Sequence, residues 1–269
     1  LWCRLDNIYI WLLMFTFLSF GLIGFLDDYK KVKDKKGLSS KAKFLMQLVS
    51  ATLISLALYI YPKFNTVLYF PFFKNLSIDL GIFYIPLMIF IIVGASNAVN
   101  LTDGLDGLAI GPSLISVSTF AIFAYISGNI VLSKYLIVPY VEGSGEITVF
   151  LMALLGAGLG FLWFNSFPAE MFMGDAGALS IGAVLGLTSI ITKQEIVLAI
   201  VGGIFVLETL SVIAQVGYYR LTGGKRLFKM APIHHHFELH GIPEPKIVVR
   251  VWIISLLLSI IALSTLKIR

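Results

Sequence analysis

The sequence has little charge and almost no cysteine. Only 13% of the 269 residues are Asp, Glu, Lys or Arg, 58% are hydrophobic, and the mean hydropathy is +0.92. So apolar a composition excludes a soluble globular domain and is typical of a polytopic membrane protein. The single cysteine, Cys3, excludes an internal disulfide.

Several functional patterns are also missing. The sequence contains neither a P-loop nor a kinase-type glycine loop, which argues against a soluble-type nucleotide hydrolase. No Ser-His-Asp or Cys-His arrangement offers a strong protein nucleophile. No cleavable signal peptide, internal repeat or linker is evident, so we expect one membrane domain over residues 1–269.

Hydrophobic stretches of membrane-spanning length dominate the chain. A transmembrane helix needs about 20 mostly apolar residues. Eight stretches approach this length: roughly 9–26, 43–61, 82–99, 108–126, 148–164, 177–192, 197–217 and 248–266. None alternates like a strand over its length, so the sequence predicts an all-α bundle of about eight transmembrane helices.

Basic residues give the orientation of this bundle. Of the 20 Lys and Arg residues, thirteen fall in two connections, after the first span and between the last two. They are Lys30, Lys31, Lys33, Lys35, Lys36, Lys41, Lys43, Arg220, Lys225, Arg226, Lys229, Lys246 and Arg250. The positive-inside rule places both connections in the cytoplasm and makes anionic lipid or an anionic substrate the natural partner.

Four polar clusters lie between the spans, each separated from the next by an even number of them. They are Asp27-Asp28, the run 97–106 (NAVNLTDGLD), Met173-Gly174-Asp175 and His234-His235-His236. The even separation predicts that all four meet at the cytoplasmic face. Polar groups near a bilayer are costly, so a catalytic site at the membrane surface is the natural interpretation.

The first two clusters are rich in carboxylates. Asp27 and Asp28 oppose the dipole at the end of the first helix, so a lysine or a metal should compensate their negative charge. Because adjacent side chains on a helix lie about 100° apart, the two carboxylates cannot face one point equally. Asn97, Asn100, Asp103 and Asp106 are spaced by three and share one face if the helix continues. Neither cluster requires a functional role: Asp27-Asp28 could be a helix end exposed to water, and Asp106 could cap the next helix.

The third cluster precedes the sixth span, and the fourth follows the seventh. Asn165, Phe172 and Asp175 precede the sixth span, where Asp175 could cap the helix or hold Mg²⁺. All four histidines lie between His234 and His240. Pro and Gly around them favour a loop over a long helix, so phosphate contact or acid–base work fits better than a zinc site.

Two polar residues lie within the seventh span. A structural role for Glu208 is at least as plausible as a catalytic one, whereas Gln215, nearer the cytoplasmic end, is a candidate for binding a ligand. Phosphoryl transfer needs mainly the positioning of the reacting groups and the neutralisation of phosphate charge. Carboxylates that bind Mg²⁺, together with lysines and histidines that contact phosphate, suit this chemistry. A lipid phosphate in the inner leaflet could itself attack a soluble, doubly phosphorylated substrate.

These motifs carry a resemblance to a known family. Leu26-Asp27-Asp28-Tyr29, the run 97–107, Phe172-Met173-Gly174-Asp175 and the run 232–238 (PIHHHFE) are similar to those of the polyprenyl-phosphate N-acetylhexosamine-1-phosphate transferases. The histidine motif favours the phospho-N-acetylmuramoyl-pentapeptide transferase branch. Bacterial members have ten spans, so the resemblance, together with a first residue that is Leu rather than Met, implies that an N-terminal part is missing.

The resemblance also implies an activity and its partners. The expected reaction transfers phospho-N-acetylmuramoyl-pentapeptide from its UDP carrier to undecaprenyl phosphate, giving lipid I and UMP with Mg²⁺ as cofactor, in peptidoglycan synthesis. The expected location is the bacterial cytoplasmic membrane, with membrane lipids as partners and no nucleic acid; a homodimer is left open.

The resemblance assigns roles to particular side chains. Asp175 would hold the metal, and Asp27 and Asp28 would act as base or as part of the metal site. Asn100, Asp103 and Asp106 would line the nucleotide side, with Phe172 stacked on uracil. His234, His235, His236 and Lys31 or Lys43 would meet the diphosphate or sugar. Asn97, Asn165 and Gln215 complete the expected substrate-binding set.

Three alternatives stay open at this stage. The nearest is a sister transferase that loads another hexosamine phosphate, against which the histidine triplet argues. An intramembrane aspartyl protease would use a pair such as Asp28 and Asp175, but these lie at helix ends. A transporter would need acids near the midplane, where Glu208 alone qualifies.

Overall fold

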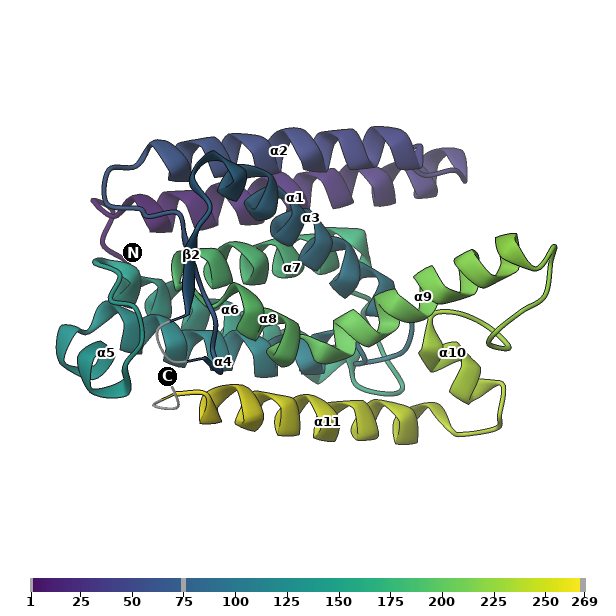
Figure 1. Cartoon of the computed structure of the whole chain (residues 1–269). Helices are drawn as coiled ribbons and strands as arrows, with labels where there is room; N and C mark the ends of the chain where they lie inside the picture. The colour runs from purple at the N-terminus through teal and green to yellow at the C-terminus, as the bar shows by residue number, and fades with distance from the viewer. Residues whose placement is uncertain (1, 74–75, 267–269) are drawn as a thin grey trace.

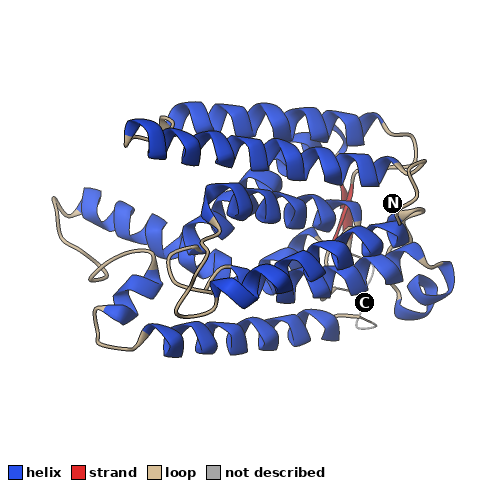
Figure 2. Cartoon of the chain, turned by 180° about the vertical axis from the view of Figure 1, so that it is seen from behind, coloured by secondary structure: helices blue, strands red, loops and turns tan. Residues whose placement is uncertain are grey.

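The computed structural model describes residues 2–73 and 76–266, which are mainly helical with very little strand (Figure 2). Eight helices in the described part are long and apolar enough to cross a membrane, so the prediction of an all-α multi-pass protein is confirmed. In chain order the long helices are α1 (Ile8–Asp34), α2 (Ser40–Ile60), α3 (Tyr84–Thr102), α4 (Ile110–Gly128), α6 (Ile147–Asn165), α7 (Gly174–Ile191), α9 (Gly203–Leu221) and α11 (Glu244–Ser264).

Shorter elements connect these helices. They are the antiparallel strands β1 (Val67–Tyr69) and β2 (Ser77–Asp79), the 3₁₀ turns η1 (Gly81–Phe83) and η2 (Ser144–Glu146), and the helices α5 (Ile130–Leu136), α8 (Glu195–Val201) and α10 (Ile233–Glu238). The hairpin and α5 lie at one end of the bundle, whereas α10 and the ends of α1 and α3 lie at the other (Figure 1). The predicted seventh span, 197–217, is divided, because the helix breaks at Gly202 between α8 and α9.

Helix α7 lies at the centre of the bundle. It packs against α1 and α3 and is buried over most of its length. Small residues allow this contact, since a Cβ added to Gly182 would lie 2.5 Å from the carbonyl oxygen of Ala95 on α3. Close backbone approach through small residues is how helices associate in lipid, where no hydrophobic force draws them together.

The helices at the periphery present apolar side chains outward. Leu22 on α1, Phe90 on α3, Trp163 on α6 and Leu257 on α11 are all exposed. Apolar surface on several sides of the bundle is what a protein surrounded by acyl chains requires.

The hairpin end is anchored by a buried lysine. Lys193, between α7 and α8, donates a hydrogen bond of 2.5 Å to the carbonyl of Asn65 and lies 3.8 Å from the centre of the Phe64 ring. Burial lowers the pKa of Lys193 to about 8, while Glu195 and Asp79 oppose that shift. The connection that follows α2 is thereby fixed to the core helix α7.

Candidate active site at the carboxylate end of the bundle

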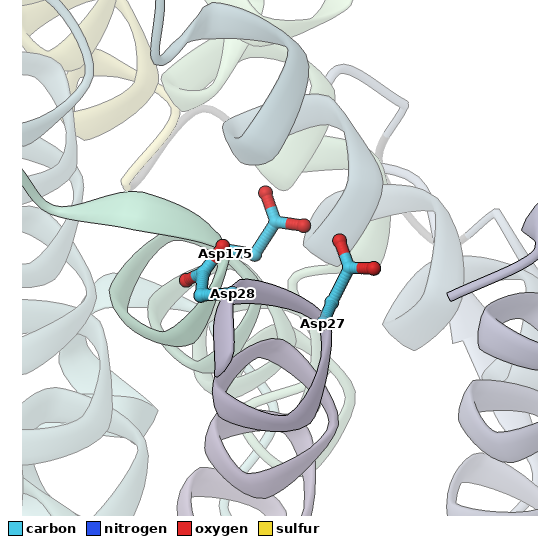
Figure 3. Close-up of side chains that lie close together, drawn as sticks. All are labelled: Asp27, Asp28 and Asp175. Atoms are coloured by element: carbon cyan, nitrogen blue, oxygen red, sulfur yellow. The ribbon is translucent and has the colours of Figure 1, made fainter. Parts of the chain in front are cut away.

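Three carboxylates from two helices meet at one point. Asp27 and Asp28 lie about two turns before the end of α1, and Asp175 lies in the first turn of α7 (Figure 3). Each offers an oxygen, and these oxygens all lie within 4.8 Å of one another. We call these three residues the acidic cluster. The two neighbours do not face this point equally, since the side chain of Asp27 is 5% exposed and that of Asp28 is 33% exposed. The expectation that the aspartate pair ends the helix and opposes its dipole is wrong, because α1 continues to Asp34.

Close backbone packing creates the acidic cluster. A Cβ added to Gly24 would lie 2.3 Å from the carbonyl oxygen of Asp175, so α1 crosses the start of α7 where no side chain fits. Gly174 has φ +61°, and a Cβ there would lie 2.7 Å from Asp28 Oδ2. That same oxygen accepts the backbone N–H of Ala176 at 3.2 Å and thus satisfies one of the free amides of α7.

Asp175 does not cap its own helix. The N-cap position belongs to Met173, which makes no side-chain cap, and Asp175 follows inside the first turn. The capping role expected of Asp175 is supplied instead by Asp28 from another helix. This leaves both oxygens of Asp175 available to side chains and favours its interpretation as a ligand-binding group.

Two lysines compensate the negative charge, as expected. Lys31 Nζ lies 2.9 Å from an oxygen of Asp27, 3.2 Å from Asp28 and 2.9 Å from Asp175. Lys43 Nζ lies 2.5 Å from Asp175 and 3.5 Å from Asp27. Three carboxylates against two ammonium groups leave the group with one formal negative charge.

The acidic cluster fits a divalent cation. Carboxylate oxygens are the hard ligands that Mg²⁺ prefers. The lysine contacts show that positive charge is stabilised here, and the side chain of Lys31 is 48% exposed, so it can turn out toward solvent. Asp27, Asp28 and Asp175 are therefore the residues that could hold such an ion.

The expected face of four polar residues between Asn97 and Asp106 is only partly formed, because α3 ends at Thr102. Asn100 donates a hydrogen bond of 2.7 Å to Asp175 Oδ1 and joins the acidic cluster. Asn97 instead donates to Gln47 of α2 at 2.8 Å. Although Asn97 and Asn100 are only three residues apart, Asn100 belongs to the candidate site and Asn97 links α3 to α2.

Asp103, at the end of α3, lies within electrostatic reach of the acidic cluster. Burial, together with the negative charges of Asp175 and Asp28, raises the pKa of Asp103 to about 6. Because the folded pKa exceeds the ordinary value of 3.8, the folded protein binds the proton more tightly than the unfolded chain. This stabilisation is present at low pH and is lost as the pH rises through about 6.

We therefore expect Asp103→Asn to stabilise the metal-free protein at neutral pH. The difference in unfolding free energy should reach at most about 3 kcal/mol above pH 6 and disappear toward pH 4, because two pKa units correspond to about that energy. Thermal unfolding of both proteins in detergent across this pH range measures it. A difference independent of pH would contradict the assignment.

Asp106 does not cap the next helix, which begins only at Ile110. Its Oδ2 accepts the backbone N–H of Ala169 at 2.9 Å, and its own N–H donates to Glu244 Oε1 at 2.7 Å. Asp106 thus joins the connection after α6 to the start of α11. The part that Asp106 plays toward a ligand stays a prediction.

Two side chains from other helices fix the neighbouring Gly107. Asn165 Oδ1 accepts its N–H at 3.1 Å, and Trp252 Nε1 donates to its carbonyl at 3.0 Å. Asn165 is expected to bind substrate, yet its other end donates to Met171, so its amide is already engaged. The contacts of Glu244 and Trp252 could not be predicted from the sequence, because no local pattern marks a residue whose partner lies so far along the chain.

Phe172 and Gln215 differ in their freedom to bind a ligand. Phe172 is 78% exposed beside the start of α7, which leaves its ring free to stack. Gln215 accepts the backbone N–H groups of Leu227 and Phe228 at 3.0 and 2.8 Å and donates to the Phe228 carbonyl. The geometry therefore favours a scaffolding role for Gln215.

The three consecutive histidines point to three different partners. His234 is 1% exposed, and its Nδ1 lies 3.1 Å from Glu208 Oε2. His235 Nδ1 lies 2.6 Å from Glu238 Oε2, and His236 Nδ1 accepts the backbone N–H of Lys229. They occupy the short helix α10 rather than the expected loop. Within the described residues, the possible metal-binding group of carboxylates and histidines includes none of them.

Comparison with known proteins agrees with these observations. The family described as glycosyl transferase family 4 matches residues 10–193. The chain is 60% identical over 266 residues to the phospho-N-acetylmuramoyl-pentapeptide-transferase of Aquifex aeolicus (strain VF5), covering 99% of this chain and 74% of that protein. Relatives with the same name from Oleidesulfovibrio alaskensis and Desulfovibrio desulfuricans are 57% and 58% identical over 271 residues, covering all of this chain and 76% of theirs.

The similarity decides among the interpretations that the sequence left open. A transferase family over most of the chain argues against the protease and the transporter. The name shared by the relatives favours the muramoyl-pentapeptide branch over the sister transferases. With glycosyl transferase family 4 matching residues 10–193 and identities of 57–60% over its whole length, this chain belongs to the phospho-N-acetylmuramoyl-pentapeptide-transferase family.

Proposed function

We propose that this chain transfers phospho-N-acetylmuramoyl-pentapeptide from its UDP carrier to undecaprenyl phosphate, with Mg²⁺ in the acidic cluster. An oxygen of the lipid phosphate attacks the phosphorus that bears the sugar, the bond to the other phosphate breaks, and UMP leaves. The products are UMP and a lipid carrying the sugar through a diphosphate. The observation that carries the proposal is the meeting of three carboxylates and two lysines at one end of a membrane bundle.

The metal, the two lysines and the carboxylates of the acidic cluster would have different roles in the reaction. Bound to the acidic cluster, Mg²⁺ would supply charge neutralisation for the diphosphate. Lys31 and Lys43 would exchange their carboxylate partners for phosphate oxygens and so orient the donor. Asp27 is almost buried and suits metal holding, whereas the more exposed Asp28 is accessible to accept a proton from the lipid phosphate.

An apolar groove suits the lipid chain. A cavity of about 320 Å³ lies among α3, α7, α8 and α9, and its lining includes Phe90, Leu185, Leu198 and Ile213. Ala98 and Val99 also line it, and the next residue, Asn100, bonds to Asp175. The groove thus reaches the last turns of α3, next in sequence to a residue that contacts the acidic cluster, and this location suits a prenyl chain whose phosphate lies at the reacting end.

The same proposal assigns an orientation to the molecule. The basic residues of the connections after α1 and α9 lie at the end that carries the acidic cluster, which the positive-inside rule assigns to the cytoplasm. A soluble UDP-sugar made in the cytoplasm would then reach the site directly. We place the protein in the bacterial cytoplasmic membrane as a single catalytic domain.

The test is product formation by detergent-purified protein given undecaprenyl phosphate, Mg²⁺ and either UDP-N-acetylmuramoyl-pentapeptide or UDP-N-acetylglucosamine. We expect UMP and a sugar-bearing lipid from the muramoyl donor only, and none after chelation of Mg²⁺. Product from the glucosamine donor alone would overturn the substrate assignment. Product that persists in excess chelator would overturn the metal.

A further inference from the structure

A buried acid and a buried histidine meet behind the site. Glu208 on α9 is 2% exposed, His234 on α10 is 1% exposed, and Oε2 of the first lies 3.1 Å from Nδ1 of the second. Within residues 2–73 and 76–266, Glu208 Oε2 and both nitrogens of the His234 ring have no hydrogen bond. A carboxylate in a membrane-spanning helix is costly unless paired, so His234 is the group that makes Glu208 tolerable.

The opposite edge of the His234 ring faces the turn after α3. A Cβ added to Gly104 would lie 2.2 Å from His234 Nε2, so the ring occupies the space that a side chain at that position would need. The turn at Gly104 therefore packs against one edge of the His234 ring, and the other edge of the ring contacts Glu208.

The turn needs such support for an electrostatic reason. Asp103 immediately precedes Gly104, and the negative charges of Asp175 and Asp28 act on it unfavourably. Its N–H and that of Gly104 bond only backward, to Asn100 and Thr102 of the same helix end. Farther along, Glu244 and Asn165 hold Asp106 and Gly107. His234 is the side chain that braces the part of the turn nearest the acidic cluster.

We propose that Glu208 is a positioning residue that acts through His234, holding the Asp103–Gly104 turn in the geometry that receives the nucleotide-sugar donor. This inference rests on the function proposed above. It assigns to the first histidine of the triplet a supporting role behind the turn in place of contact with the diphosphate. His235 and His236, which are less buried, are left to face the substrate.

The test compares Glu208→Gln, His234→Gln and the double variant in the transferase assay. Glu208→Gln preserves side-chain volume and removes the charge. We expect the KM for the UDP-sugar to rise about tenfold, because small displacements of positioning groups have effects of this size or larger. The KM for the lipid acceptor should stay as in the unaltered protein, and the double variant should be no worse than either single one, since the residues act as a unit.

Hydrogen exchange supplies a second readout. We expect faster amide exchange across residues 103–107 in Glu208→Gln, with the rate over 130–141 at the far end of the bundle unchanged. Ser211→Ala is the matched control, because this buried hydroxyl on α9 bonds only to its own helix. Should Glu208→Gln fail to fold, Glu208→Asp, which keeps the charge but sets it one carbon back, carries the same comparison.

The outcomes separate the two proposals. If the unaltered protein makes no product, the proposed function fails regardless of the variants. If the unaltered protein is active but Glu208→Gln keeps its donor KM and its exchange at 103–107, the positioning role is wrong. Equal increases in both KM values, or a double variant that multiplies the single effects, would reduce the pair to general stabilisation and also overturn the proposal.

Discussion

Replacing Asp175 with Asn should lower turnover by about 10³-fold or more, since charge placement at the reacting phosphates carries most of the barrier reduction in such chemistry. Asp175 links all parts of the site: it contacts Lys31, Lys43 and Asn100 and shares the acidic cluster with Asp27 and Asp28. Asn preserves the shape and a carbonyl oxygen but removes the charge. The loss should therefore appear in kcat rather than in folding.

Asp34→Asn is the matched control. Asp34 ends α1 at the same end of the bundle and is exposed, so its removal changes net charge equally without touching the acidic cluster. We expect near-normal rates of UMP release from this variant. Activity of Asp175→Asn close to that of Asp34→Asn would mean that the acidic cluster is not the reaction centre.

Gly24→Ala should disrupt the site without altering any functional side chain. The added methyl group would lie 2.3 Å from the carbonyl oxygen and 2.4 Å from the carbonyl carbon of Asp175, which are backbone atoms that cannot turn aside. Helix α1 must then move away from α7, carrying Asp27 and Asp28 with it. We expect a loss of activity of about 10²-fold and a lower midpoint of thermal unfolding.

Gly160→Ala is the control, because it shows whether any glycine-to-alanine change in a membrane helix lowers activity and stability. Gly160 on α6 has open space where its Cβ would be. Alanine is also the better helix former, so stability should be equal or slightly higher and activity unchanged. An active, stable Gly24→Ala would contradict the close approach of α1 and α7 that creates the acidic cluster.

Hydropathy and charge predicted the eight spans and the shared location of the polar clusters, because lipid dictates span length and leaves polar groups at the ends. Helix boundaries were harder to predict. Gly174 begins α7 earlier than the apolar run suggests, and Gly202 divides the seventh span. Local backbone geometry decides both, whereas hydropathy averages over many residues.

Partnerships across the fold could not be predicted. The type and location of Asp28 pointed to function, but that it caps α7 depends on how closely α1 crosses that helix. The three histidines looked equivalent, yet one short helical turn directs them to different partners, and only His234 enters the bundle. Gln215 has both ends of its amide committed to the loop that follows α9. Such outcomes depend on three-dimensional neighbours that no spacing rule encodes.

The proposed function requires that Asp27, Asp28 and Asp175 form one cation site. Binding of Mn²⁺, a paramagnetic substitute for Mg²⁺, to the detergent-purified protein can be followed by the loss of the free-ion signal in electron paramagnetic resonance. We expect saturable binding that excess Mg²⁺ reverses, retained in Asp34→Asn and abolished in Asp175→Asn. Binding that is equally strong in Asp175→Asn would contradict a metal site at these three carboxylates and locate any metal elsewhere.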